Sequence, residues 1–282
     1  MPELPEVQTV VSQLEEKVTG KTIKSVWSEW LKAVRPSLAI FERRVIGAKI
    51  VETRRKGKHI VLDLDNDFSI VIHLKMTGHL LVKHDANRDS EAFRDPYNQF
   101  IHHILTFADG TTLEFSDMRK FGWMEAMPTA GVETLPSIAS LGIDALSEEL
   151  TPKTFDAIIE KKGKSKIGAL LLDQTIIAGI GNIYRSEALF QSGILPERLA
   201  SSLSKAQRHA LLMRIKKVLR KALTFRGMSD GDFRDTDGRE GEFQKILGVY
   251  GRDGKPCPKC GTMIQRVRIG QRSAFFCPTC QR

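Results

Sequence analysis

The sequence predicts an α+β multidomain protein, in which an N-terminal helix and a β-rich first half precede a helical second half. Three observations predict this class: a helical apolar stripe near the start, strand-like segments between about 23 and 127, and helical periodicity after 151. A chain of 282 residues is long enough for two domains, or for one large domain with an appendage. Its composition, 41% hydrophobic and 27% charged, is ordinary for a globular protein.

The first predicted helix contains a valine-rich stripe that ends before Gly20. Its apolar residues recur at intervals of three and four, which places them on one helical face: Val7, Val10, Val11, Leu14 and Val18. We therefore expect this helix to bury the stripe in a core and to hold Pro2 at its leading edge.

The next hundred residues have the pattern of short β-strands separated by turns. Strand-like segments lie at 60–64, 69–74, 103–107 and 112–115, and Ala108–Thr111 is typical of a hairpin turn. Several short strands with turn sequences between them predict a β-sandwich or a barrel.

Residues 128–150 are poor in strand pattern and rich in Gly, Pro, Ala and Ser, as in a linker between domains. Thr151 and Pro152 suit the cap and first position of a helix that runs to about Lys161. Three further segments have helical periodicity, with a glycine turn at 178–181 before the second of them: 166–174, 182–191 and 204–225.

The charge is distributed unevenly between the two halves. Residues 1–150 carry 18 Lys and Arg against 22 Asp and Glu, whereas residues 151–282 carry 25 against 12, so the net charges are −4 and +13. This asymmetry favours a polyanionic partner for the second half, nucleic acid rather than membrane, although a solvated basic surface is the plain alternative.

The sequence excludes several classes of protein. No apolar run approaches the ~20 residues that span a bilayer, and the N-terminus lacks the basic and apolar regions of a secretory signal. All four cysteines fall in the last 26 residues, which favours a reducing, cytoplasmic location.

Those cysteines form the pattern Cys257-x2-Cys260 and Cys277-x2-Cys280, which is typical of a four-thiolate zinc ribbon. Residues 267–276 between the pairs predict the hairpin that brings the two knuckles together. Four thiolates leave no open coordination position, so we expect one structural zinc ion rather than a catalytic one. Disulfides are the alternative interpretation.

The N-terminus itself has the composition of a covalent catalyst. Removal of Met1 would leave Pro2 with a secondary amine, which can attack an electrophilic carbon and form an iminium. Carboxylates at Glu3 and Glu6 could supply a proton or orient the amine. A capped helix start, with Pro5 and acidic residues at its positive end, explains the same residues without any chemistry.

Two other motifs are compatible with contacts to nucleic acid. The turn at 179–182 precedes a helix and offers backbone N–H groups to an anion, although glycine turns between helices are usually only turns. Arg119 and Phe121 place a cation beside an aromatic ring, which suits a wedge in a base stack. The structural alternative is a core Phe121 and an Arg119 that is paired with Asp117.

Together these motifs resemble the formamidopyrimidine-DNA glycosylase family. The resemblance rests on PELPEV at 2–7, GK at 57–58, DMRKFG at 117–122, LLDQ at 171–174, GIGNIY at 179–184 and the terminal cysteine ribbon. It extends from residue 2 to residue 281, with the motifs in the family's order.

The resemblance implies a fold in several parts. An N-terminal helix and a two-layer antiparallel β-sandwich would form a catalytic domain over 1–131, and 132–150 would be a linker. A helix–two-turn–helix DNA-binding domain with a lesion-capping loop would occupy 151–242, and a C-terminal zinc finger would occupy 243–282.

It also implies an activity and a set of site residues. The activity is excision of oxidised purines from damaged double-stranded DNA by a monomer, followed by β- and δ-elimination at the abasic site. Pro2 would attack C1′ of the flipped nucleotide, Glu3 would act as acid and base, and Glu6 would support them. The resemblance assigns DNA contacts to Lys58, which the family also counts as catalytic, and to Met76, Arg119, Phe121, Asn182 and Arg272. Arg119 would bond the orphan cytosine.

Three positions depart from the common pattern of the family. Gly168 stands where many relatives carry a lysine, so one DNA contact is missing or is taken over by Lys164 or Lys166. Thr77 stands where some relatives have a glutamate, and residues 227–235 match the lesion-capping loop loosely.

Two other functions compete with this interpretation. The sister endonuclease VIII group removes oxidised pyrimidines with the same terminal proline, but it usually fills the void in the duplex with other residues. A non-catalytic zinc-ribbon DNA-binding protein would explain the basic half and the cysteines, but not Pro2 and Glu3.

Overall fold

The computed structural model describes residues 1–229 and 231–282, which form two compact units. The first unit comprises residues 1–139 together with 223–244, and the second comprises residues 140–222 together with 245–282. After α7 (Lys205–Thr224), the longest helix, the chain therefore returns to the first unit. The domains expected from the sequence are each one continuous segment and do not include this return. Among the described residues, no helix is long and apolar enough to cross a membrane.

The first unit is built on two β-sheets. The four-stranded sheet has the order β1 (Ile23–Ser28), β7 (Ile101–Phe107), β8 (Thr112–Asp117) and β6 (Gly78–Lys83). The five-stranded sheet has the order β2 (Val34–Arg35), β9 (Trp123–Pro128), β5 (Phe68–His73), β4 (His59–Leu64) and β3 (Ile50–Lys56). All pairings are antiparallel except β2 with β9.

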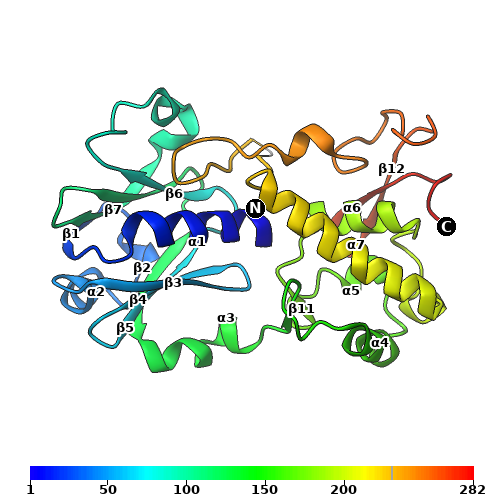
Figure 1. The fold of residues 1–282 in the computed structure, drawn as a ribbon, viewed down its shortest axis with the longest axis horizontal. Coiled ribbons are helices and arrows are strands. Elements are labelled where there is room, and N and C mark those ends of the chain that lie inside the picture. Colours follow the sequence, from blue (N-terminus) through cyan, green and yellow to red (C-terminus); the bar gives the residue numbers. More distant parts are fainter. Residues whose placement is uncertain (230) are drawn as a thin grey trace. The chain divides into compact units, whose positions relative to one another are not determined.

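Two helices close the open sides of this sandwich. Helix α1 (Leu4–Val18) packs against β3 and β6, the edge strands of the two sheets, and Figure 1 shows it running between them. Helix α2 (Leu38–Val45) packs against β1, β2 and β9 on the other side. The valine-rich stripe predicted from the sequence lies buried in the core between the sheets.

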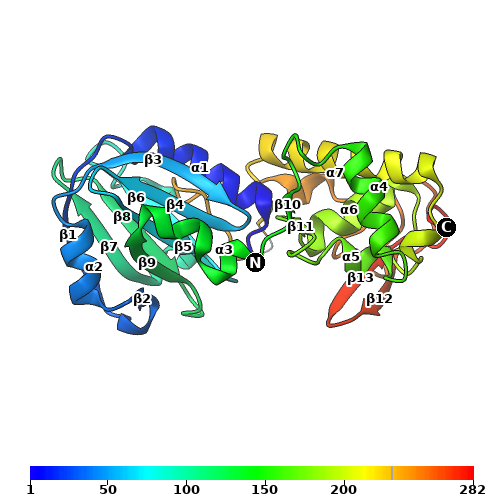
Figure 2. The same ribbon diagram turned by 90° about the horizontal axis from the view of Figure 1, so that it is seen from below.

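The five-stranded sheet is covered on its outer face as well. The 3₁₀ helix η4 (Thr129–Thr134) and helix α3 (Pro136–Ala139) pack Val132 and Ile138 against Val61, Val71 and Trp123 (Figure 2). Because both faces are covered, every residue of β4 is buried, which explains its continuous apolar sequence. Part of the segment that resembles a linker therefore belongs to the sandwich. Shorter 3₁₀ turns lie at Leu31–Ala33, Glu91–Arg94 and Pro96–Gln99.

The second unit is helical. Its elements are β10 (Ile143–Asp144), α4 (Pro152–Lys161), α5 (Ile167–Leu170), β11 (Ile177–Ala178), α6 (Asn182–Ser192), the 3₁₀ turn Ala200–Ser202 and α7 (Lys205–Thr224), whose last residues enter the first unit. The 3₁₀ turn Phe243–Ile246 then precedes the hairpin of β12 (Gln265–Ile269) and β13 (Arg272–Phe276).

Most of the predicted helices are confirmed, and one is shorter than predicted. Thr151 caps α4 through its side-chain oxygen, as its sequence indicates. The helix predicted over 166–174 ends at Leu170 instead, because the chain turns there and the Gln174 side chain bonds Leu172 O and Ile180 O. These bonds form the two-turn connection to α6.

A cluster of buried rings lies at the ends of strands in the five-stranded sheet. The His59 and His73 ring centroids are 4.6 Å apart, and Trp123 lies within 6.1 Å of both. Burial lowers the pKa of His59 to about 4 and that of His73 to about 2, so both rings are neutral at physiological pH. Lys58 directly precedes His59 and Lys75 follows His73 by two positions, and both lysines belong to loops that carry predicted site residues.

We predict that the first unit loses stability as the pH is lowered from about 6.5 toward 4. The buried imidazoles of His59 and His73 bind protons only at or below about 4, whereas histidines of the unfolded chain bind them near 6.5. The unfolded state therefore holds more protons in this window, and each ring contributes a slope of up to about 1.4 kcal/mol per pH unit.

Urea unfolding at several pH values, followed by tryptophan fluorescence, measures this slope. The three tryptophans, at 27, 30 and 123, all lie in the first unit, so their fluorescence reports on that unit. His59→Phe keeps a ring in the cluster, and its stability should fall less steeply with acid. Identical slopes in the two proteins would contradict the prediction.

Candidate active site and nucleic-acid interface

The N-terminal site is built on the first turn of α1. Pro2 is buried at its leading edge, and Glu3 is 3% exposed. Glu6 Oε2 accepts a hydrogen bond from the N–H of Glu3 at 2.8 Å, in a capping-box arrangement. The capped-helix interpretation and the catalytic one are therefore compatible, because the cap itself orients the residue that follows Pro2.

The second oxygen of Glu6 holds a distant segment of the chain. Glu6 Oε1 accepts from Met228 N at 2.7 Å. Gly227 has a φ of +78°, and a Cβ at this position would lie 2.6 Å from the same oxygen. Only glycine permits this approach, so the carboxylate joins the N-terminus to residues 223–244. Within the loosely matched loop at 227–235, Asp230 lies outside the described residues.

Lys58 follows the tight turn between β3 and β4 and is 7% exposed. Gly57 has a φ of +56° in this turn. Arg55 donates to Gly57 O and to Gln8 Oε1 of α1, both at 2.9 Å, and so ties the turn to the first helix. The element that carries Lys58 is thus anchored to the element that carries Pro2.

Met76, Arg119 and Phe121 come together although they lie on two different loops. The guanidinium of Arg119 lies 4.7 Å from the centroid of the Phe121 ring, and Nη1 lies 3.2 Å from Met76 Sδ. Met76 and Phe121 are 36% and 51% exposed, so both apolar side chains are accessible at the surface. The Phe121 ring is not a core residue, so that structural alternative is wrong.

Asp117 holds the loop of this trio through backbone contacts. Its Oδ1 accepts from the N–H of Arg119 at 3.2 Å and from the Thr77 hydroxyl, and its Oδ2 accepts from Gly122 N at 2.7 Å. The Thr77 hydroxyl in turn accepts from Arg119 N at 3.0 Å. These bonds leave the guanidinium with Phe121 and Met76, and they give Thr77 a role in joining the two loops.

Each of the two loops also carries a lysine in the left-handed region. Lys75 has a φ of +54° and Lys120 a φ of +56°, conformations that cost non-glycine residues energy and are frequent at functional sites. Lys75 N donates to His73 Nδ1 at 2.9 Å, and the Lys120 ammonium lies 5.0 Å from the Trp30 ring. The first of these contacts is local, whereas the second joins residues 90 positions apart, which sequence patterns do not reveal.

In the second unit, Asn182 is the first residue of α6. The Gln174 side chain accepts from Gly179 N at 3.0 Å and donates to Ile180 O at 2.8 Å, which holds the glycine turn before the helix. Asn182 Oδ1 accepts from the guanidinium of Arg185 at 2.6 Å. Arg272 is exposed at the start of β13, beside the hairpin turn at Gly270.

The four cysteines meet in the second unit. Their Sγ atoms all lie within 4.8 Å of one another, and three of the separations are 3.4 to 3.9 Å. Such distances are far too long for disulfides, and they match the ~3.8 Å that follows from a tetrahedron of ~2.3 Å Zn–S bonds. The donor set fits one structural zinc, and the disulfide alternative is wrong.

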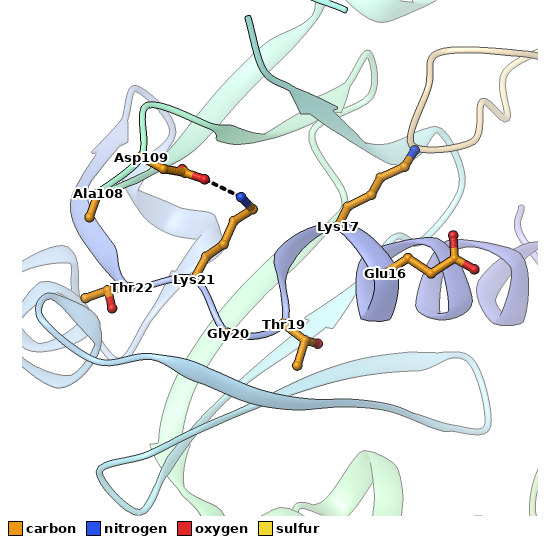
Figure 3. Close-up of a pocket in the computed structure, with 8 residues that line it drawn as sticks. All are labelled: Glu16, Lys17, Thr19, Gly20, Lys21, Thr22, Ala108 and Asp109. Atoms are coloured by element: carbon orange, nitrogen blue, oxygen red, sulfur yellow. Dashed lines mark hydrogen bonds and ion pairs between the residues drawn. The ribbon is translucent and has the colours of Figure 1, made fainter. Parts of the chain in front are cut away.

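A surface hollow elsewhere in the first unit is not part of the predicted site. It is lined by Glu16, Lys17, Thr19–Thr22, Ala108 and Asp109 (Figure 3). Lys21 pairs with Asp109 across it, and Lys17 bonds Asp237 Oδ1 at 2.6 Å. No predicted site residue lines the hollow, and its lysines are already paired with acids.

Comparison with known proteins identifies the family. Three family profiles match the chain: the formamidopyrimidine-DNA glycosylase N-terminal domain at 1–124, the formamidopyrimidine-DNA glycosylase H2TH domain at 141–233, and a zinc finger found in FPG and IleRS at 254–282. The chain belongs to the formamidopyrimidine-DNA glycosylase family.

Relatives match along their whole length. The formamidopyrimidine-DNA glycosylase of Pelotomaculum thermopropionicum is 39% identical over 283 residues, covering 100% of this chain and 99% of the relative. That of Chloroflexus aggregans is 39% identical over 282 residues, covering 100% of this chain and 98% of the relative.

Solved structures agree with this assignment. A MutM protein in complex with DNA containing carbocyclic 8-oxo-G has a TM-score of 0.87 and 32% identity, with complete coverage of both chains. The MutM (Fpg) protein from Thermus thermophilus has a TM-score of 0.85 and 33% identity, and the match covers 99% of this chain and 98% of that one.

Membership in this formamidopyrimidine-DNA glycosylase family defines the activity. The chain is a bifunctional DNA glycosylase and abasic-site lyase that removes oxidised purines in base excision repair. The predicted architecture is confirmed: a β-sandwich domain, a helix–two-turn–helix domain and a C-terminal zinc finger.

We predict that Cys277→Ser abolishes DNA binding and leaves the first unit folded. Cys277 is fully buried, and a small ribbon has too little core to keep its shape without the metal. The tryptophan fluorescence of the first unit should remain native, while the affinity for duplex DNA is lost.

Thr279→Ser is the matched control, because it alters the same knuckle but keeps the thiolate set and a hydroxyl. It should bind zinc and DNA as the unaltered protein does. A Cys277→Ser protein that binds DNA normally, or an unaltered protein without zinc, would be incompatible with this prediction.

Proposed function

We propose that the secondary amine of Pro2, freed by removal of Met1, is the nucleophile of the reaction on damaged double-stranded DNA. The observation that carries the proposal is the capped first turn of α1, in which Glu6 binds the backbone of Glu3 next to Pro2. The amine attacks C1′, the C1′–N bond to the base breaks, and the iminium forms as the sugar ring opens.

Glu3 acts as the acid and base at the sugar ring, and Glu6 is a supporting residue. Ring opening leaves a negative charge on O4′, which needs a proton from a nearby acid. Glu3 is adjacent in sequence to Pro2 and nearly buried. β-Elimination then breaks the C3′–O3′ bond and δ-elimination breaks the C5′–O5′ bond, which leaves phosphates on both sides of a gap.

Met76, Arg119 and Phe121 fill the space that the flipped nucleotide leaves. Their loops place an exposed thioether and an exposed ring against one guanidinium. Phe121 wedges the stack, and Arg119 donates to the orphan cytosine, whose base edge offers acceptors.

Lys58, Asn182 and Arg272 contact phosphates around the lesion, and Lys58 also serves in catalysis. Such contacts set affinity and register rather than the identity of the base. Damaged duplex DNA is the partner, as in the solved relatives whose complexes contain it. We further infer that one copy of the chain acts alone, in the cytoplasm at the nucleoid. Residues 1–131 would serve as the catalytic domain, and 151–242 with 243–282 would bind DNA.

We predict that a hydride donor such as borohydride traps the protein on a duplex with 8-oxoguanine opposite cytosine. Reduction of the iminium converts it to a stable amine and so to a permanent crosslink. Pro2→Gly keeps an amine but loses the rigid ring, so the crosslink yield should fall sharply. An N-terminal tag turns the nitrogen into an amide and should abolish the crosslink.

The same tag at the C-terminus is the matched control and should leave trapping intact. If the N-terminally tagged protein still crosslinks, another amine is the nucleophile, and Lys58 is the first to test. A thymine glycol duplex serves as the second substrate. Faster cleavage of thymine glycol would favour the endonuclease VIII type of activity, and absence of any strand cleavage would favour a DNA-binding protein without catalysis.

We predict that Arg119→Ala relaxes the preference for cytosine opposite the lesion by about 5-fold or more, since bidentate contacts to a base contribute ~1–3 kcal/mol. Cleavage of a preformed abasic site should decrease less, because no damaged base must be extruded. Single-turnover rates with each of the four opposite bases measure the preference.

Met118→Ala is the control on the same loop, since Met118 is 42% exposed and has no proposed role. It should keep the preference for cytosine. An Arg119→Ala protein with unaltered preference would show that Arg119 only supports the loop.

A further inference from the structure

We propose that Arg185 is a positioning residue that sets the orientation of the Asn182 amide toward a DNA phosphate. It also joins Asn182 to the hairpin that carries Arg272. The inference rests on the proposed function, in which Asn182 and Arg272 contact phosphates. All the residues that carry it lie in the second unit.

The side chain of Arg185 is fully buried at the centre of three elements. Its Nη1 donates to Gly168 O of α5 at 3.1 Å. Its Nη2 donates to Asn182 Oδ1 of α6 at 2.6 Å and to Ser273 O of β13 at 2.7 Å. Since Ser273 follows Arg272 directly, one guanidinium holds the supports of both predicted phosphate contacts.

The chemistry of the amide means that the contact with Arg185 determines the orientation of the Asn182 side chain. An asparagine side chain has an oxygen that only accepts and an NH₂ group that only donates, and a guanidinium only donates. Oδ1 of Asn182 must therefore face Arg185, which leaves the NH₂ group for another partner. A phosphate oxygen only accepts, so this orientation is the one that binds DNA, whereas the flipped amide would present an oxygen to an anion.

Gly168, whose carbonyl accepts from Arg185, is packed closely against its neighbours. A Cβ at residue 168 would lie 2.7 Å from Pro196 O and 3.0 Å from Ile269 Cδ1, so the site excludes any side chain. Position 168 thus supplies a backbone carbonyl to Arg185 and no side chain. Nearby, the ammonium of Lys166 pairs with Glu197 at 2.9 Å.

The ribbon has anchors that do not depend on Arg185. Both oxygens of the buried Glu187 accept from the backbone N–H groups of Gly248, Val249 and Tyr250. The Gln281 side chain bonds Cys277 N and Ile194 O. We therefore expect a variant of Arg185 to keep the zinc ribbon docked. The hydrogen bonds that it loses are those to the hairpin, to Gly168 and to Asn182.

The test uses duplexes that contain an abasic-site analogue, in which single phosphates near the lesion are replaced one at a time by neutral methylphosphonate. In the unaltered, zinc-loaded protein, substitution of the phosphate bound by Asn182 should raise Kd about 10-fold or more, as expected for one hydrogen bond to a charged group. Asn182→Ala should abolish the rise at that phosphate alone and so identify it.

Arg185→Met is then measured on the same duplexes. We expect it to weaken binding and to abolish the rise at the phosphate bound by Asn182, while the rise at phosphates contacted from the first unit persists. In the Asn182→Ala background, Arg185→Met should cost less affinity than it does alone, because the two residues act as one unit. If Arg185→Met does not fold, Arg185→Lys takes its place, since it keeps the charge but lacks the planar fork.

Arg214→Met is the matched control, because it removes an exposed arginine from the same unit and leaves Asn182 untouched. It should retain the full methylphosphonate effect. An Arg185 variant that keeps the effect at that phosphate would overturn the proposal, as would an Asn182→Ala protein that still shows every effect. If the unaltered protein neither binds nor cleaves damaged duplexes, the proposed function fails instead.

Discussion

The carboxylate of Glu6 joins the N-terminal turn of the first unit to the segment 223–244, which returns to that unit. One oxygen binds the N–H of Glu3, and the other binds Met228 N in a segment more than two hundred residues further along the chain. A buried carboxylate needs such partners to offset the loss of water, so the contact is costly to break. The position of Pro2 and the return of residues 223–244 to the sandwich are therefore coupled through one side chain.

Carboxylates also accept hydrogen bonds from backbone N–H groups at two other loops. Asp117 accepts from the backbone N–H groups of Arg119 and Gly122, and Glu187 accepts from three successive N–H groups before the zinc ribbon. Charge-assisted bonds of this kind are among the strongest in proteins, and a carboxylate has enough lone pairs to hold a whole turn. Buried acids thus shape the loops, and the guanidinium of Arg119 contacts Met76 and Phe121 instead of holding its own loop.

The loops of Met76 and Phe121 carry features that cost folding free energy. Large apolar side chains at Met76 and Phe121 remain exposed, and the lysines beside them adopt left-handed backbone conformations. Such strain persists only where the surroundings enforce it, here through Asp117, Thr77 and the buried histidines. Contacts that hold Met76, Arg119 and Phe121 together reduce the ordering entropy that would be lost if these residues bound a partner.

The sequence by itself determined the features that depend on local spacing. The period of the first helix, the cap at Thr151 and the two Cys-x2-Cys pairs predict their structures because each involves residues that are neighbours in the chain. The terminal proline and the family motifs likewise indicated the chemistry, because each is a short segment and they follow one another along the chain in the family's order. None of these inferences needs knowledge of contacts across the fold.

Only the tertiary structure decided the features that depend on distant partners. The early end of α5 follows from the Gln174 bonds to the glycine turn, and the position of the Arg119 guanidinium follows from contacts on two loops. The three bonds of Arg185 likewise join residues 168, 182 and 273. Sequence periodicity shows which face of a helix or strand is buried. The hydrogen-bond partner of a polar side chain depends instead on which groups the fold places near it. Long-range hydrogen bonds are for this reason a property of the fold rather than of any segment.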